Sequence, residues 1–199
     1  MKIVHLITTI DLGGAERQLC TLASTQAMLG NEVEVINLKG KSTLKLIFEQ
    51  NGVKVNQKIC NKSILFQIIW LFIYINFNCE IVHAHLSRAE LISALIKMKP
   101  KLIISKHNSE RLIPKSNQWF SQKIASFIFL RSDAVIVISN AVKNYLISIS
   151  EIRLNSKLKK VYYASERENL FPHATVIKSS KGFRFGTVCR LDPQKDVKT

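Results

Sequence analysis

Two histidine segments hold the side chains best suited to chemistry. His83 and His85 lie two residues apart in an apolar run, and because strand side chains repeat every two residues, both imidazoles face the same side. His107 follows another apolar run, within Lys106-His107-Asn108-Ser109. At that position a histidine can polarise a substrate hydroxyl or bind a phosphate, so His107 is the stronger catalytic candidate.

The paired histidines leave three interpretations. A zinc site needs at least three protein ligands, and no nearby Cys, Asp or Glu spacing supplies a third. We therefore expect no metal here. His85 lining a polar crevice and a purely structural pair both remain open.

Two further segments are suited to binding anions. Gly13 and Gly14 follow an apolar run and open a helix-period segment, where bare N–H groups and the helix dipole attract an anion. A glycine turn needed only for close packing is the alternative. Arg190 and Lys195 flank a turn at Pro193, and a rigid guanidinium beside a mobile ammonium suits a diphosphate. The alternative is that these are two surface cations with no ligand.

Alternating strand and helix patterns must position these residues. The alternation predicts an α/β fold with a doubly wound, Rossmann-like parallel sheet whose ligand crevice lies beyond the carboxyl ends of the strands. Three polar segments, 11–14, 85–88 and 106–111, leave strands at that edge. The predicted strands are 2–9, 33–38, 53–55, 80–84, 102–105 and 134–138, and the later helices are 88–98, 117–130 and 141–149.

An apolar segment from Ile64 to Phe77 stands apart from this alternation. It is shorter than the roughly 20 residues needed to span a bilayer. It predicts either a buried helix beginning near Ser63 or a helix lying partly in a membrane surface, an interpretation favoured by Trp70 and Tyr74.

The composition limits the class of protein. The chain has 199 residues, a net charge of +15 and 47% hydrophobic residues, which is typical of a globular domain. Residues 101–199 carry 18 basic and 7 acidic side chains, so the second half is the basic one. Anionic lipid, phosphorylated substrates or a solubilising surface explain this. Nucleic acid is not expected as a partner, because no recognition helix, zinc site or aromatic stacking motif is evident.

The arrangement of motifs resembles a known family. In order and spacing, six segments are similar to glycosyltransferase family 4: 2–6, 13–17 (Gly-Gly-Ala-Glu-Arg), 29–35, 80–85 (Glu-Ile-Val-His-Ala-His), 134–139 and 185–195. The family has the GT-B fold of two Rossmann-like domains and comprises metal-independent, retaining transferases that use nucleotide-sugar donors. The resemblance therefore implies no cofactor.

The resemblance also implies a domain organisation. Residues 1–165 would be the N-terminal, acceptor-binding domain, 166–182 a linker and 183–199 the beginning of a truncated C-terminal domain. The nucleotide-base site and the family's paired-glutamate motif would then be missing. We expect the 199 residues alone to be inactive.

Site roles follow residue by residue from the family. The histidine that matches His107 lies by the reacting sugar. The turn at 162–166 (Tyr-Tyr-Ala-Ser-Glu) departs from the family's Asn-Gly-Ile-Asp-like pattern. The resemblance assigns the donor diphosphate to Gly13, Gly14, Arg190 and Lys195, and the acceptor to Asp11, Glu16 and His85.

The family most often serves lipopolysaccharide, capsule or exopolysaccharide synthesis. This implies a glycan or lipid-linked acceptor and a cytoplasmic protein bound peripherally at the inner face of the membrane. Four dispersed cysteines and an N-terminus without signal-peptide features agree with a reducing compartment. A non-catalytic membrane- or glycan-binding module and a GT-B sugar-nucleotide epimerase are the alternatives.

Overall fold

The computed structural model describes residues 1–114, 116–153, 156–164 and 186. All its strands and helices belong to one compact unit, Met1–Ser165. The predicted linker at 166–182 and the predicted second-domain segment at 183–199 lie outside the described residues, Gly186 excepted. The elements are β1 (Lys2–Ile7), α1 (Gly14–Met28), β2 (Glu32–Asn37), α2 (Lys45–Gln50), β3 (Lys54–Asn56), α3 (Ile64–Asn78), β4 (Ile81–His85), α4 (Ser87–Ile96), β5 (Lys101–Lys106), α5 (Gln118–Arg131), β6 (Ala134–Val137), α6 (Asn140–Ser148) and β7 (Leu158–Lys160).

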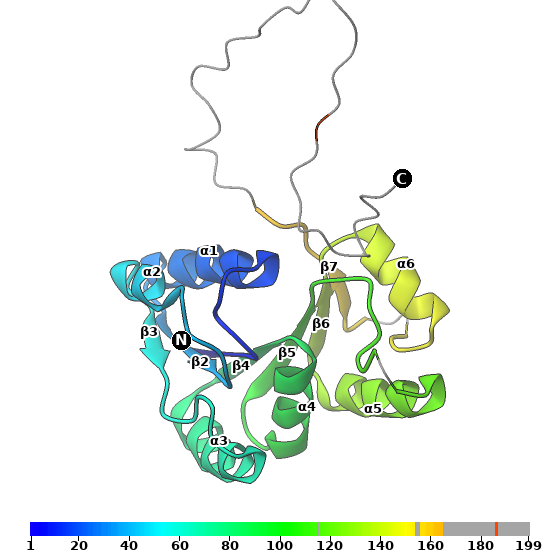
Figure 1. The fold of residues 1–199 in the computed structure, drawn as a ribbon, viewed down its shortest axis with the longest axis horizontal. Coiled ribbons are helices and arrows are strands. Elements are labelled where there is room, and N and C mark those ends of the chain that lie inside the picture. Colours follow the sequence, from blue (N-terminus) through cyan, green and yellow to red (C-terminus); the bar gives the residue numbers. More distant parts are fainter. Residues whose placement is uncertain (115, 154–155, 165–185, 187–199) are drawn as a thin grey trace, which may run out of the picture. The chain divides into compact units, whose positions relative to one another are not determined.

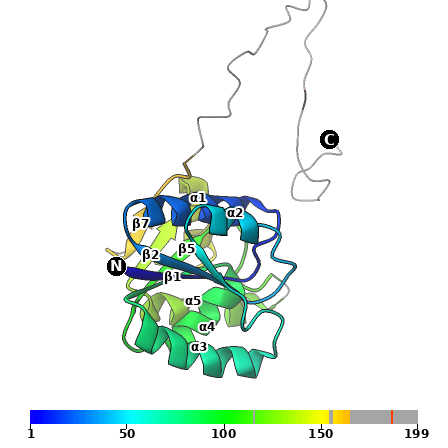
Figure 2. The ribbon, with the colours of Figure 1, turned by 90° about the vertical axis from the view of Figure 1, so that its left-hand side faces the viewer.

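The seven strands form one parallel sheet in the order β3-β2-β1-β4-β5-β6-β7. The central strands are almost wholly buried, as parallel strands covered on both faces must be. Helices α1 and α2 cover one face, and α3, α4 and α5 cover the other (Figures 1 and 2). The predicted doubly wound, Rossmann-like α/β fold is confirmed.

Each face of the sheet has its own apolar core. On one face, Leu19 and Ala23 of α1 and Phe48 of α2 pack with buried side chains of β1 and β2. The larger core on the other face joins the strands to α3, α4, α5 and α6. Side chains alternate between the two cores along each strand, so the register of the sheet decides which polar groups share a face.

Most predicted elements are present with shifted ends. The first strand ends at Ile7 instead of residue 9, and the helix predicted at 88–98 spans Ser87–Ile96. Helix α2 was not predicted, because six residues are too few to show a helical period.

Helix α3 begins where predicted, with the Ser63 hydroxyl accepting from the Phe66 N–H. The interpretation of α3 as a fully buried helix is wrong. Its inner face carries the polar side chains Gln67 and Asn76, whose amide N–H groups donate to backbone carbonyls. Their oxygens accept from the Arg88 guanidinium and from the Met98 N–H. Its outer face is apolar, and Phe77 is 72% exposed. Among the described residues, no helix is long and apolar enough to cross a bilayer.

Candidate functional site

A cavity of about 390 Å³ lies on the α1 side of the sheet, over β4, β5 and β6. Helix α1 forms one wall, and the segment 161–164 after β7 forms another. The lining side chains come from every second residue of each strand, and they are paired with one another across the sheet. They therefore all point to the same face. The polar groups that face the cavity include Gln18, Gln26, His85, Ser105, His107 and Tyr163.

His107 links this cavity to the sheet. Its Nε2 lies 2.9 Å from Nδ1 of His85, and its Nδ1 is hydrogen-bonded to the Tyr163 hydroxyl. Burial, and then the nearby Lys106 charge, lower the pKa of His107 from 6.5 to about 4. His107 is therefore neutral at physiological pH and has one nitrogen free of a proton, as a hydrogen-bond acceptor for a hydroxyl group requires.

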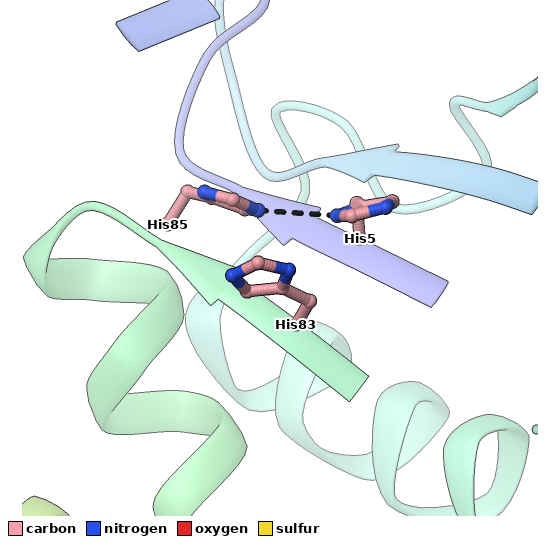
Figure 3. Close-up of side chains that lie close together, drawn as sticks. All are labelled: His5, His83 and His85. Carbon is pink, nitrogen blue, oxygen red and sulfur yellow. Dashed lines mark hydrogen bonds between the residues drawn. The ribbon is translucent and has the colours of Figure 1, made fainter. Parts of the chain in front are cut away.

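A third histidine, which sequence reasoning missed, joins the pair on β4. His5 on β1 is opposite His83 in the parallel register, so its side chain lies on the same face. Figure 3 shows the three imidazoles together, with His5 Nδ1 3.1 Å from His85 Nε2. His5 and His85 are effectively buried, and His83 is hydrogen-bonded separately to Ser105 at 2.7 Å.

The expectation that the pair lacks a third potential metal ligand is thus corrected. One ring nitrogen from each of His5, His83 and His85 lies within 4.8 Å of the others. Both nitrogens of His5 and both of His85 are already engaged, however, in hydrogen bonds to side chains. A metal at this position would have to break the His5–His85 bond, so the donor set fits a hydrogen-bonded network better than a metal site.

Burial keeps the whole histidine group neutral. It lowers the pKa of His5 to about 4, although the hydrogen bond to Gln26 acts in the opposite direction. The pKa values of His83 and His85 are well below 6.5, first because of burial and then because of the neighbouring histidines. Burial, followed by the charge of Glu16, raises the pKa of Tyr163 to about 12, so this hydroxyl stays protonated.

The glycine turn lies at the carboxyl end of β1, as predicted. Gly13 precedes α1 and Gly14 is its first residue. A Cβ on Gly13 would collide with the side chain of Glu16, whereas one on Gly14 would meet nothing within 4 Å. Glu16 also accepts a hydrogen bond from the Thr9 hydroxyl at 2.9 Å. A side chain at position 13 would therefore require the Glu16 carboxylate to move away from its present position beside Thr9.

Asp11 already has partners in the structure. Its carboxylate accepts from the Lys41 N–H at 3.1 Å and from the Thr43 hydroxyl at 3.2 Å, which fastens the loop between β2 and α2 to the loop after β1. Asp11 therefore joins two loops at this edge of the sheet, and its acceptor-binding role stays a prediction.

A buried ion pair lies at the carboxyl end of β5, next to His107. The Lys106 Nζ lies 2.5 Å from Glu90 of α4, and the Glu90 side chain is 3% exposed. The loop after β5 is held by another buried carboxylate, because Glu151 accepts from the Leu112 N–H at 2.8 Å. These two acids fix the segment that carries His107, and no sequence motif indicated either one.

The turn from β4 into α4 is strained. Leu86 has φ 70° and ψ 149°, a conformation that costs a side-chain-bearing residue about 1–3 kcal/mol. It follows His85 directly, and its side chain packs into the core beneath α1 and α2. The packing of Leu86 holds this turn, and with it the N-terminus of α4, at the site.

The structure thus brings together His85 and His107 around one cavity, and it places Gly13, Gly14, Asp11 and Glu16 at the neighbouring carboxyl end of β1. Arg190 and Lys195, predicted to hold a diphosphate, lie outside the described residues. Sequence reasoning missed His5, Gln26 and Tyr163. A histidine at an alternate position of the first strand was the one available signal for His5.

The sequence pattern described as Glycosyltransferase Family 4 matches residues 12–154, which is more than half of the chain. The chain belongs to glycosyltransferase family 4. No curated protein is similar enough in sequence to be counted as a relative.

Solved structures share the fold of this family 4 chain. Anabaena HepE in complex with UDP matches with a TM-score of 0.64 and 19% identity over 83% of this chain and 45% of that one. A sucrose-phosphate synthase from Thermosynechococcus elongatus matches with a TM-score of 0.56 and 11% identity, over 81% and 48% of the two chains. A glycosyltransferase from Rickettsia africae matches with a TM-score of 0.57 and 19% identity, over 81% and 42%. The chain thus spans somewhat less than half the length of these proteins.

Proposed function

We propose that this family 4 chain is the acceptor-binding part of a retaining glycosyltransferase that moves a sugar from a nucleotide-sugar donor to a glycan or lipid-linked acceptor. In this reaction the bond from the anomeric carbon to the donor phosphate breaks, and the acceptor oxygen forms a new bond to that carbon. The hydroxyl proton leaves with the diphosphate or to solvent. Support for a nucleotide-sugar donor comes from HepE, which was solved in complex with UDP and with UDP-glucose.

The single observation that carries the proposal is the neutral His107 at the edge of the cavity beside α1. A neutral imidazole accepts a hydrogen bond from a sugar hydroxyl, which an imidazolium cannot do. His85 would orient His107, and Asp11 and Glu16 would border the acceptor. Gly13 and Gly14, with Arg190 and Lys195, would face the donor diphosphate, whose charge grows as the bond breaks.

We further propose that the acceptor is reached at an anionic membrane surface, at the cytoplasmic face, in cell-surface polysaccharide or lipopolysaccharide synthesis. The outer face of α3 is apolar, and two lysines lie against aromatic rings of this helix: the Lys99 ammonium is 4.8 Å from the centre of the Phe77 ring, and the Lys58 ammonium is 5.8 Å from that of Trp70. An apolar helical face bordered by lysines binds lipid by burial and by attraction to anionic headgroups. The exposed apolar residues of α3 are Ile64, Leu65, Phe66, Ile69, Phe72, Ile73 and Phe77.

Sedimentation with vesicles of phosphatidylglycerol and phosphatidylcholine tests the membrane surface. Changing Phe72 and Ile73 together to serine should weaken binding about tenfold, equivalent to about 1.4 kcal/mol. The matched control changes Leu46 and Ile47 of α2, which are also exposed but lie on the opposite face of the sheet. Equal loss in both double variants would refute the assignment of α3.

Titration of the purified chain, observed by NMR, tests the acceptor assignment. Octyl glucoside, a sugar on an alkyl chain, should shift the resonances of His107 and His85. UDP should bind weakly, with a Kd above about 1 mM, and UDP-glucose should not be turned over by these 199 residues alone. Tight binding of UDP, or shifts from octyl glucoside confined to residues far from the cavity, would refute the acceptor-side assignment.

A further inference from the structure

An unbroken series of side-chain hydrogen bonds runs from Gln26 of α1, along the face of the sheet that α1 covers, to Tyr163 after β7. It begins at Gln26, whose Oε1 lies 2.7 Å from His5 Nε2, and it continues from His5 Nδ1 to His85 Nε2 at 3.1 Å. From His85 Nδ1 it reaches His107 Nε2 at 2.9 Å, and His107 Nδ1 is bonded to the Tyr163 hydroxyl. Each imidazole therefore uses both of its nitrogens.

This arrangement requires neutral rings. A neutral imidazole has one N–H donor and one acceptor nitrogen, whereas an imidazolium has two donors. An imidazolium at His85 would direct both its N–H groups at its neighbours and reverse the polarity of one bond. The charged groups nearest the series are Lys106 beside His107 and Glu16 beside Tyr163, and the burial of the rings outweighs both.

One end of the series determines the direction of every bond in it. The amide oxygen of Gln26 can only accept, so His5 must carry its proton on Nε2 and leave Nδ1 as an acceptor. His85 must then donate from Nε2 to His5, and His107 must donate from Nε2 to His85. The Tyr163 hydroxyl at the other end can either donate or accept, so it adapts and imposes nothing.

We propose that Gln26, His5 and His85 form a relay of positioning residues that fixes the tautomer of His107, with the proton on Nε2 and the lone pair of Nδ1 directed to the cavity. Aligned hydrogen bonds polarise one another, so the relay also strengthens Nδ1 as an acceptor. In this structure Tyr163 donates to that lone pair. A substrate hydroxyl that takes the place of Tyr163 would meet the same acceptor, and this catalytic consequence alone rests on the proposed function.

His83 is not part of the relay, although its ring centroid lies only 4.2 Å from that of His85. Its Nε2 is bonded to Ser105, and within the part of the chain that the structure describes its ring makes no hydrogen bond to His5 or His85. His83 therefore provides an internal reference, since its tautomer should not follow changes at Gln26.

Long-range ¹H–¹⁵N correlation spectra of the histidine-labelled, 199-residue chain measure each tautomer directly and need no substrate. We expect His5, His85 and His107 to be Nε2–H tautomers at pH 7. In Gln26→Leu the ratio of Nε2–H to Nδ1–H at His107 should fall about fivefold, the effect of losing one hydrogen bond. Gln26→Glu, which retains an acceptor oxygen at the same reach, should keep the wild-type ratio.

Gln18→Leu is the matched control. Gln18 also lies on α1 and lines the cavity, but it donates to the Ala164 carbonyl and to no histidine. A wild-type ratio in Gln18→Leu together with the shift in Gln26→Leu supports the relay. Nδ1–H tautomers in the wild type, or an unchanged ratio in Gln26→Leu, would overturn it.

Titration with Zn²⁺ separates the relay from a metal site. Metal binding needs the lone pairs of both His5 and His85 at the point where they share a proton. Unchanged spectra with equimolar Zn²⁺ support the relay, whereas loss of the His85 Nε2–H signal together with a shift of the His5 Nδ1 resonance would overturn it. These measurements use no sugar, so they test the relay independently of the proposed transferase reaction. Refuting that reaction would leave the relay unaffected.

Discussion

Acidification should destabilise the folded chain through its buried histidines. All four histidines among the described residues have pKa values below 6.5 in the folded state. Below pH 6.5 the unfolded chain therefore binds more protons than the folded chain. By linkage, the free energy of unfolding is fully retained above about pH 6.5 and falls as the pH approaches 4.

The magnitude follows from the shift at His5. A pKa that changes from 6.5 to about 4 is equivalent to about 3 kcal/mol of stability lost once the pH is below both values. At pH 5 the unfolded state holds about 0.9 proton more at this ring, which gives a slope of about 1.2 kcal/mol per pH unit. The pKa values of the other three rings are lowered too, so each adds to the loss in the same direction. Since a domain of this size has about 5–15 kcal/mol of stability, we expect it to unfold in mild acid.

Urea unfolding at pH values from 7.5 to 4.5 measures this slope. His5→Gln removes one titrating ring and should reduce the slope near pH 5 by about 1.2 kcal/mol per pH unit, whatever it costs at pH 7. Gln18→Asn, which changes a non-titrating side chain on α1, should retain the wild-type slope. The reasoning is refuted if the His5→Gln slope equals that of the wild type.

Three further substitutions test features around the site by urea unfolding. Glu90→Gln leaves Lys106 buried and unpaired, so the free energy of unfolding should fall by about 3–5 kcal/mol. The double variant with Lys106→Met should recover most of this loss, and equal stability of the single and double variants would contradict the reasoning. Glu151→Gln weakens the charge-assisted bond from the Leu112 N–H and should cost about 1–3 kcal/mol, and a change below about 0.5 kcal/mol would show that this carboxylate does not hold the loop. Leu86→Gly should be more stable than Leu86→Ala by about 1 kcal/mol, the reverse of the usual order, because glycine alone relieves the positive φ; the usual order would show that the turn is unstrained.

The alternation of strands and helices was predictable because each element shows its period locally. Ser63 marked the beginning of α3 for the same reason, since a capping hydroxyl and the helix it caps are adjacent in sequence. The positions of Gly13 and His107 at the carboxyl edge of the sheet were predictable because each lies in a loop that leaves a strand. The carboxyl ends of parallel strands meet at one edge, so proximity there follows from topology alone.

What could not be predicted depends on contacts between distant segments. His5 and His85 are 80 residues apart, and they meet only because β1 and β4 are neighbours in a particular register. Glu90 faces Lys106 across a helix–strand contact that no spacing indicates. The exposed face of α3 could not be predicted, because a nearly uniform apolar sequence does not show which side of a helix faces solvent. The buried side is the one whose amides, Gln67 and Asn76, bond to backbone carbonyls.

The strand order has a consequence for synthesis of the chain. Every strand after β1 pairs with a strand that has already been made: β2 and then β3 extend one side of β1, and β4 through β7 extend the other. The sheet can therefore grow outward from its first strand as the chain leaves the ribosome, and only β4 must return across an intervening segment to find its partner. Among the residues that the structure describes, the outermost strand on each side has three residues, and these strands carry Lys54, Lys159 and Lys160, which discourage pairing with another molecule.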